Sequence, residues 1–125
     1  MLETPVARTS HQIAEQAGCT YRQLDYWTRN HVIGPSIAIA NGSGTARRWS
    51  DTDLILVRVI TRLAALGAGA DVLGQTVISL RKRGHTALAG ASRVVVVPTA
   101  DYLGVNRVIL DGHADGQAAW VIPLR

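Results

Sequence analysis

The sequence predicts an α+β fold that is mainly α, and three features carry this prediction. The first is a repeated helix-start signal, in which a hydroxyl side chain is followed three residues later by a side chain that can reach back to the backbone. Three pairs fit this spacing: Thr9 with Gln12, Thr20 with Gln23, and Ser50 with Asp53. The second is the turn dipeptide Asn41-Gly42 between β-prone residues, which predicts a hairpin. The third is the change after Gly84 to short apolar runs that predict strands.

The first predicted helix begins at Thr9 and leads into a tight turn. Ile13, Ala14 and Ala17 share one face of this helix. Gly18 then supplies the backbone freedom that a turn between two packed helices requires. We therefore expect a helix-turn-helix.

The second predicted helix begins at Thr20 and has two distinct faces. Leu24 and Trp27 share the inward face, together with the following Ile33. The opposite face is polar, aromatic and mostly basic: Tyr21, Arg22, Asp25, Tyr26 and Arg29. Such a face is suited to a polyanionic partner.

A hairpin and a third helix are predicted to follow. Gly34-Pro35 ends the helical region, because proline removes a backbone donor and disfavours helix in the residue before it. Residues 37–40 and 45–49 then pair as two strands, which completes a winged helix-turn-helix. The third helix, about residues 51–66, is apolar around nearly its whole circumference and needs a second covering surface.

The rest of the chain is predicted to hold one more helix and a small β segment. The fourth helix, about residues 70–83, turns Leu73, Val77 and Leu80 inward and ends in cations before Gly84. Three strands follow, at residues 93–98, 105–111 and 117–124, and the loop 111–116 is expected to join the last two as a hairpin. Three strands alone are barely stable in water, so we expect them to cover the third helix, to pair with another chain, or both.

Charge and composition narrow the class of protein. Residues 8–84 hold ten Lys or Arg and five Asp or Glu, whereas residues 85–125 hold three of each. A basic surface attracts polyanions, and each cation on a phosphate releases a counterion. The single cysteine, Cys19, cannot form an internal disulfide, which fits a cytoplasmic location. No signal peptide or membrane-spanning stretch is recognised.

The predicted domains are a flexible leader at residues 1–8, a winged helix-turn-helix at residues 9–84, and a small β segment for dimerisation or ligand sensing at residues 85–125. Trp27 and Trp49 are expected in the core, because each falls on the inward phase of its element.

Residues 9 to about 84 resemble the MerR family of bacterial transcription regulators. The matching residues are Gln12-Ile13-Ala14, Ala17-Gly18, Leu24, Tyr26-Trp27, Ile33, Pro35, Arg47, Trp49-Ser50 and Asp53-Leu54. The runs 21–27 and 80–84 especially resemble an actinobacterial or phage branch with a short C-terminal β segment in place of a long coiled coil. The resemblance implies a DNA-binding regulator of transcription and not an enzyme.

The chain departs from the family pattern at two places. Asp25 stands where most members have Arg in a Leu-Arg-Tyr-Tyr run, and we expect Arg22 to provide the backbone contact instead. The long antiparallel dimerisation helix and the metal-sensor cysteines of the family have no counterpart in residues 85–125. The usual DNA-distorting dimer is therefore not implied directly, although a homodimer through the β segment is expected.

A recognition helix enters the major groove by its N-terminus, where Arg can bridge guanine O6 and N7, so Tyr21 and Arg22 are expected on base edges. Tyr26 and Arg29 are expected on phosphates, and Arg47 and Arg48 on the backbone or minor groove. The full predicted DNA-binding set is Thr20, Tyr21, Arg22, Tyr26, Arg29, Arg47 and Arg48.

Simpler interpretations remain open for these residues. Arg22 and Arg29 could be solvated surface charges, Tyr26 could be partly core, and Arg47 and Arg48 could mark a charged edge strand. Cys19 is interpreted as a small packed residue, and Asp111, His113 and Asp115 as loop residues and not metal ligands. No cofactor is expected.

The expected partners are double-stranded DNA, a second copy of the chain, and RNA polymerase or another protein at the C-terminal segment. Two alternative functions use the same features. One is a phage or plasmid excisionase-type factor that bends DNA at tandem sites. The other is a partner-binding module that captures a protein at a strand edge of the β segment.

Overall fold

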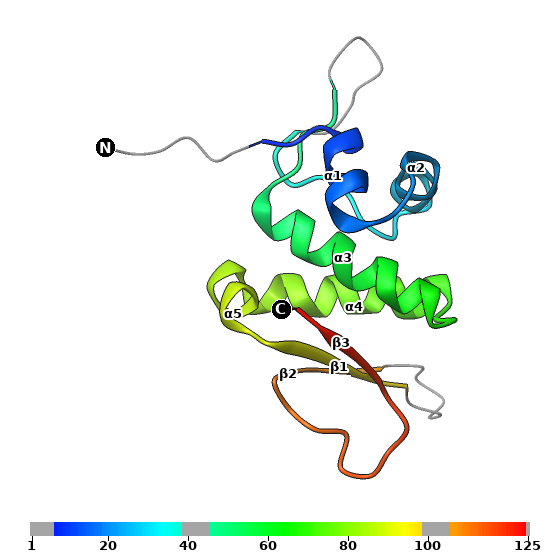
Figure 1. Ribbon diagram of the computed structural model, residues 1–125, viewed down its shortest axis with the longest axis vertical. Helices are drawn as coiled ribbons and strands as arrows, with labels where there is room; N and C mark the ends of the chain where they lie inside the picture. The colour runs from blue at the N-terminus through cyan, green and yellow to red at the C-terminus, as the bar shows by residue number, and fades with distance from the viewer. Residues whose placement is uncertain (1–6, 39–45, 99–105, 125) are drawn as a thin grey trace. The chain divides into compact units, whose positions relative to one another are not determined.

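The computed structural model describes residues 7–38, 46–98 and 106–124 (Figure 1). Its elements are α1 (Ser10–Ala17), α2 (Tyr21–Arg29), α3 (Asp51–Ala65), α4 (Ala70–Arg83), α5 (His85–Gly90), β1 (Arg93–Val97), β2 (Arg107–Leu110) and β3 (Trp120–Pro123). They form two compact units, Met1–Arg58 and Val59–Arg125. No helix in the described ranges is long and apolar enough to cross a membrane.

The three predicted helix starts are confirmed. Thr9 Oγ1 accepts a hydrogen bond from the Gln12 backbone N–H, and Gln12 Oε1 accepts one from the Thr9 N–H at 2.9 Å. At the start of α2, Thr20 Oγ1 accepts from the Gln23 N–H at 3.0 Å. Each such cap stabilises its helix by about 1 kcal/mol, because it satisfies a backbone donor that the helix leaves unpaired.

The start of α3 is capped in the same reciprocal way and also holds the chain that precedes it. Ser50 Oγ accepts from the Asp53 N–H at 3.1 Å, and Asp53 Oδ2 accepts from the Ser50 N–H at 2.9 Å. Asp53 is fully buried, and the same oxygen accepts from both the backbone N–H and the hydroxyl of Ser36 at 2.8 Å. One carboxylate therefore joins α3 to the segment that leaves Pro35.

The turn between α1 and α2 has the predicted form. Gly18 has a φ of +83°, a conformation in which a side chain would be strained. The N–H groups of Gly18 and Cys19 both donate to the carbonyl oxygen of Ala14 at 3.0 Å. This closes α1 and starts the short connection to α2.

Both tryptophans of the N-terminal unit lie in its core, as predicted. Trp49 is fully buried, and its indole N–H donates to Ser10 Oγ at 2.9 Å, while Trp27 is 4% exposed. Ile13 and Leu24 are also fully buried. The inward faces assigned to α1 and α2 are therefore confirmed.

The segment at residues 46–49, which we call the return segment, is paired on both sides. Arg48 forms an antiparallel bridge with Ala38, and Trp49 forms one with Arg8. Residues 39–45, where the tip of the predicted wing falls, lie outside the described residues. The assignment of Arg8 to a flexible leader was wrong, because Arg8 exchanges two backbone hydrogen bonds with Trp49 and its guanidinium contacts Asp51 and Gln16.

In the C-terminal unit, α4 has the predicted bounds and buries Leu73, Val77 and Leu80. Figure 1 shows this helix running along the small sheet. Arg83 Nη2 donates to the Val108 carbonyl oxygen of β2 at 3.0 Å, and Asn106 donates to Gln75 Oε1 from its backbone N–H and its amide. The sheet therefore covers α4, a contact that the sequence pattern does not predict.

The sheet order is β2-β1-β3, with both outer strands antiparallel to β1. The predicted hairpin between the last two strands was therefore wrong. The valines at positions 94–97 are all buried, and a strand buried along its length occupies the centre of a sheet, with a neighbour at each edge. Asp111 turns the chain away from β2 with a φ of +55°, and its Oδ1 accepts from the Ser92 N–H at 2.7 Å.

Helix α5 was not predicted, since residues 85–92 were assigned to the β segment. It is only six residues long, and no side chain caps its N-terminus. Leu88, 1% exposed, is the residue that anchors it. A single apolar anchor gives no periodicity, so tertiary burial and not local pattern decides this helix.

Candidate nucleic-acid interface

The outward face of α2 carries the predicted recognition residues. Tyr21 and Tyr26 are 42% and 58% exposed, so the interpretation of Tyr26 as partly core was wrong. Arg22 is exposed in the first turn, next to the cap residue Thr20, which is also exposed. This face therefore offers aromatic rings and a guanidinium to solvent from one helix.

Tyr21 is held by His11, which is not among the predicted DNA-binding residues. The imidazole of His11, in the first turn of α1, stacks on the Tyr21 ring with a centroid distance of 4.2 Å and an interplanar angle of 11°. The stack restricts the ring, although Tyr21 as a whole stays exposed. No sequence signal marks this pair, because the two residues lie on different helices.

Asp25 lies between two of the predicted DNA-binding arginines. Its Oδ1 accepts from Arg47 Nη1 at 2.8 Å, and its Oδ2 pairs with Arg29 Nε at 2.9 Å. The Arg29 pair has the i, i+4 spacing of a helix and could be read from the sequence. The Arg47 pair joins α2 to the return segment, so it could not be read from the sequence.

The two arginines lower the pKa of the Asp25 carboxyl from its ordinary value of 3.8. The hydrogen bond from Arg47 is the largest cause, partial desolvation opposes it, and the charges of Arg29 and Arg47 add to the lowering. Asp25 is therefore ionised at neutral pH. Its negative charge is offset by two cations, so the surface around it stays basic.

Arg22 and Arg48 differ from Arg29 and Arg47 in having no ion-pair partner within the described ranges. Arg22 is exposed on α2, and Arg48 is half-buried in the return segment beside the bridge to Ala38. Their guanidinium donors are thus available to an external acceptor.

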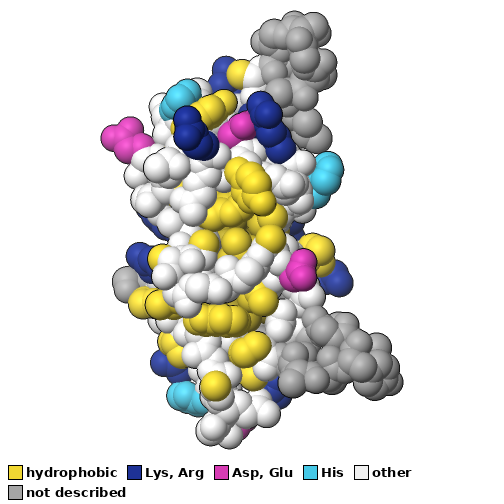
Figure 2. All heavy atoms as spheres, turned by 90° about the vertical axis from the view of Figure 1, so that its right-hand side faces the viewer, with side chains coloured by type: hydrophobic (Ala, Val, Ile, Leu, Met, Phe, Trp, Pro, Cys, Tyr) yellow, Lys and Arg dark blue, Asp and Glu magenta, His cyan; other side chains and the backbone are white. Residues whose placement is uncertain are grey.

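Four of the seven predicted residues line one hollow: Tyr21, Arg29, Arg47 and Arg48. Figure 2 shows dark blue Lys and Arg side chains beside a magenta acidic one in the N-terminal unit. The hollow has a volume of about 460 Å³ and is lined by Thr9, Ser10, His11, Tyr21, Asp25, Arg29, Ala46, Arg47 and Arg48. Its cations come from two segments far apart in the sequence, α2 and the return segment.

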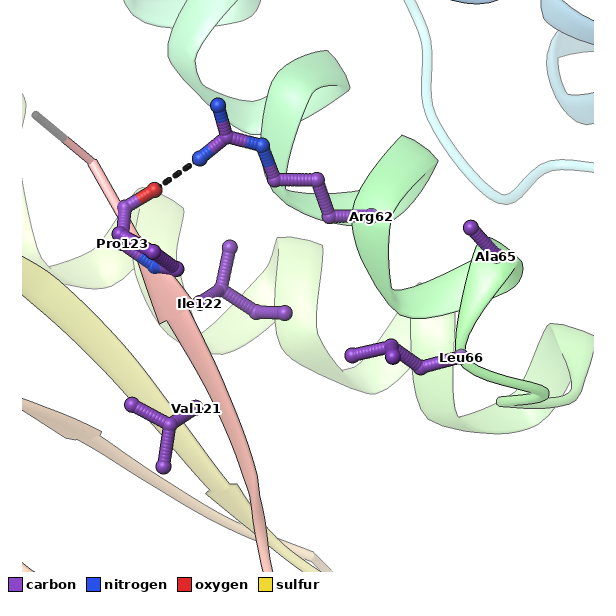
Figure 3. A pocket seen from close by; sticks show the side chains of 6 residues that line it. All are labelled: Arg62, Ala65, Leu66, Val121, Ile122 and Pro123. Carbon is purple, nitrogen blue, oxygen red and sulfur yellow. Dashed lines mark hydrogen bonds between the residues drawn. The ribbon is translucent and has the colours of Figure 1, made fainter.

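The C-terminal unit has a different, mostly apolar hollow of about 400 Å³ (Figure 3). It is lined by Arg62, Ala65, Leu66, Val121, Ile122 and Pro123. Arg62 at its rim donates to the Pro123 carbonyl oxygen. Leu66 and Val121 are both more than half exposed, which leaves apolar surface at this edge of the sheet.

The loop after β2 has a structural role, because it contacts the start of β1. Asp111 accepts from the backbone at the start of β1, and His113 Nδ1 lies 3.3 Å from Arg93 Nη2. Within the described ranges, no three His, Cys, Asp or Glu side chains are grouped to hold a metal ion.

Comparison with known proteins places residues 8–72 in a family described as MerR HTH family regulatory protein. Three curated relatives, one from Mycobacterium bovis and two from strains of Mycobacterium tuberculosis, are named as uncharacterised HTH-type transcriptional regulators. Each is 42% identical over 73 residues, which are 58% of this chain and 32% of the relative. The match thus spans about a third of the length of those relatives.

Proposed function

Because the chain belongs to the MerR family of helix-turn-helix regulatory proteins, we propose that it binds duplex DNA sequence-specifically and regulates transcription. The observation that carries this proposal is the exposed face of α2, on which Tyr21, Arg22 and Tyr26 point away from a core formed by Leu24 and Trp27. In this proposal the protein acts in the cytoplasm.

In this proposal α2 is the recognition helix. Its first turn enters the major groove, where Arg22 donates to guanine O6 and N7 and Tyr21 contacts an adjacent base edge. The stack of His11 on Tyr21 supports this role, because a ring that is already restricted loses little entropy on binding.

In this proposal the DNA backbone is contacted by four residues: Tyr26, Arg29, Arg47 and Arg48. Contacts to phosphate set the register and orientation of the helix, and they carry most of the salt-dependent affinity. The two antiparallel bridges of the return segment support a wing that carries Arg47 and Arg48 to the same side as α2.

We further propose that the C-terminal unit joins two copies of the chain. In the described ranges β3 pairs only with β1, so its other backbone edge is open to a second strand. The exposed side chains of Leu66 and Val121 at this edge supply apolar surface for the contact. A two-fold pair of this kind would bind two half-sites.

The test is selection of duplexes from a random library by the purified protein, followed by affinity measurement on the selected and random duplexes. We expect one enriched motif that is bound well above random DNA. The control is Lys82→Ala, which removes one exposed cation from α4 and should enrich the same motif. Enrichment of no motif would contradict sequence-specific binding, and tandem repeats of one motif would favour a DNA-bending factor.

A further inference from the structure

Asp25 is the acidic residue on the face of α2 that the proposed function turns toward DNA. A carboxylate there repels phosphate, so its presence needs a reason. Both of its oxygens are engaged: Oδ1 accepts from Arg47 Nη1 at 2.8 Å, and Oδ2 pairs with Arg29 Nε at 2.9 Å. The contact with Arg47 crosses 22 positions of sequence and ties α2 to the return segment.

The side chains of the two arginines differ in how exposed they are. The Arg29 side chain is 74% exposed, so its position is set mainly by its own helix. The Arg47 side chain is 19% exposed and Asp25 is 21% exposed, so this pair is largely covered and well placed. The hydrogen bond to Asp25 uses one of the five guanidinium donors of Arg47 and leaves others for an external acceptor.

We propose that Asp25 is a positioning residue, which holds the Arg47 guanidinium beside α2 so that it binds a DNA phosphate. The inference rests on the proposed function. Without the carboxylate, a long arginine side chain has many rotamers, and ordering one of them on binding lowers affinity. Asp25 therefore strengthens binding to a polyanion even though it carries a negative charge.

Replacement of Asp25 should therefore change the affinity for DNA in a definite direction. If Asp25 contributed only its charge, its removal would tighten binding to DNA. If it positions Arg47, Asp25→Ala weakens binding by about 2- to 13-fold, the range for ordering one long side chain on binding. The slope of log affinity against log salt should also shrink by about 0.9, the value for one phosphate contact.

The experiment compares wild type, Asp25→Ala, Arg47→Ala and the double variant on the duplex that the wild type selects. Asp25→Ala should cost affinity in the wild-type background and none in the Arg47→Ala background, because there is then no side chain left to position. Glu15→Ala is the control. It removes an exposed negative charge from α1 that has no ion-pair partner within the described residues, and it should tighten binding slightly.

Asp25→Asn keeps the shape of the side chain and one acceptor for Arg47, so it should bind between wild type and Asp25→Ala. If thermal denaturation shows that Asp25→Ala is unfolded, the affinity of Asp25→Asn tests whether Asp25 positions Arg47. Tighter binding by Asp25→Asn, or equal losses from Asp25→Ala in both backgrounds, would overturn the inference while leaving the proposed function intact. A wild-type protein that binds neither selected nor random duplexes would overturn both.

Discussion

In the proposed function, Arg22 is the residue of α2 that distinguishes bases. It is exposed in the first turn and has no ion-pair partner in the described ranges, unlike Arg29 and Arg47, which share Asp25. A guanidinium without an internal acceptor keeps all five donors for a guanine edge or a phosphate.

We therefore expect Arg22→Ala to weaken binding to the selected duplex by about 1–3 kcal/mol and to random duplexes much less. The reason is that a bidentate base contact is made only on the right sequence. Competition binding measures the ratio of the affinity for the selected duplex to that for random duplexes. Equal losses on both would assign Arg22 to a phosphate.

The ion pairs of Asp25 predict a pH effect with a definite sign. Its folded pKa is lowered from 3.8, so its stabilising contribution is present above that value and is lost as pH falls through the folded pKa. A carbon-detected NMR titration of the Asp25 carboxyl should give a midpoint below 3.8 in wild type and a higher midpoint in Arg47→Ala. A midpoint that does not move in Arg47→Ala would exclude Arg47 as the main cause.

At the scale of elements, the return segment is the second DNA-binding candidate. Changing Arg47 and Arg48 to Ala should weaken binding to selected and random duplexes alike and reduce the salt slope by about 1–2 units. The matched control is the change of Arg81 and Lys82 on α4 to Ala, which removes the same exposed charge from the C-terminal unit. If both double variants change the slope equally, only total charge matters and the return segment has no special place.

The start of α3 supports the same region through Asp53. Asp53→Ala removes the acceptor for Ser36 and Ser50, so it should lower the free energy of unfolding by about 2–4 kcal/mol. Asp51→Ala is a control in the same helical turn: that carboxylate is 58% exposed in its pair with Arg8, and the cost should stay under about 1 kcal/mol. Denaturant unfolding measures both, and similar costs would mean that the buried network adds nothing.

At the scale of the whole molecule, the open edge of β3 leads to a prediction about assembly. Val121→Lys should convert the proposed homodimer to a monomer in sedimentation and abolish cooperative binding to paired half-sites, because it places a charge in the contact. Ile78→Lys changes a similarly exposed apolar residue on α4 and should leave the dimer intact. A wild-type chain that is monomeric at micromolar concentration would contradict the dimer.

The helix starts, the inward faces and the basic face of α2 follow from the sequence alone. These properties are local, since a cap needs residues three apart and a helical face needs residues three or four apart. For this reason the sequence identifies Thr9, Thr20 and Ser50 as caps, and Trp27 and Trp49 as core residues.

The strand order, helix α5 and the pairing of Asp25 with Arg47 depend instead on tertiary contacts. Each depends on which surfaces meet: β1 became central because its valines are buried, and α5 formed around the single anchor Leu88. The carboxylate of Asp25 lies 22 positions from Arg47, and no periodicity relates residues on different elements. Contacts between distant segments arise from packing, which a local pattern does not encode.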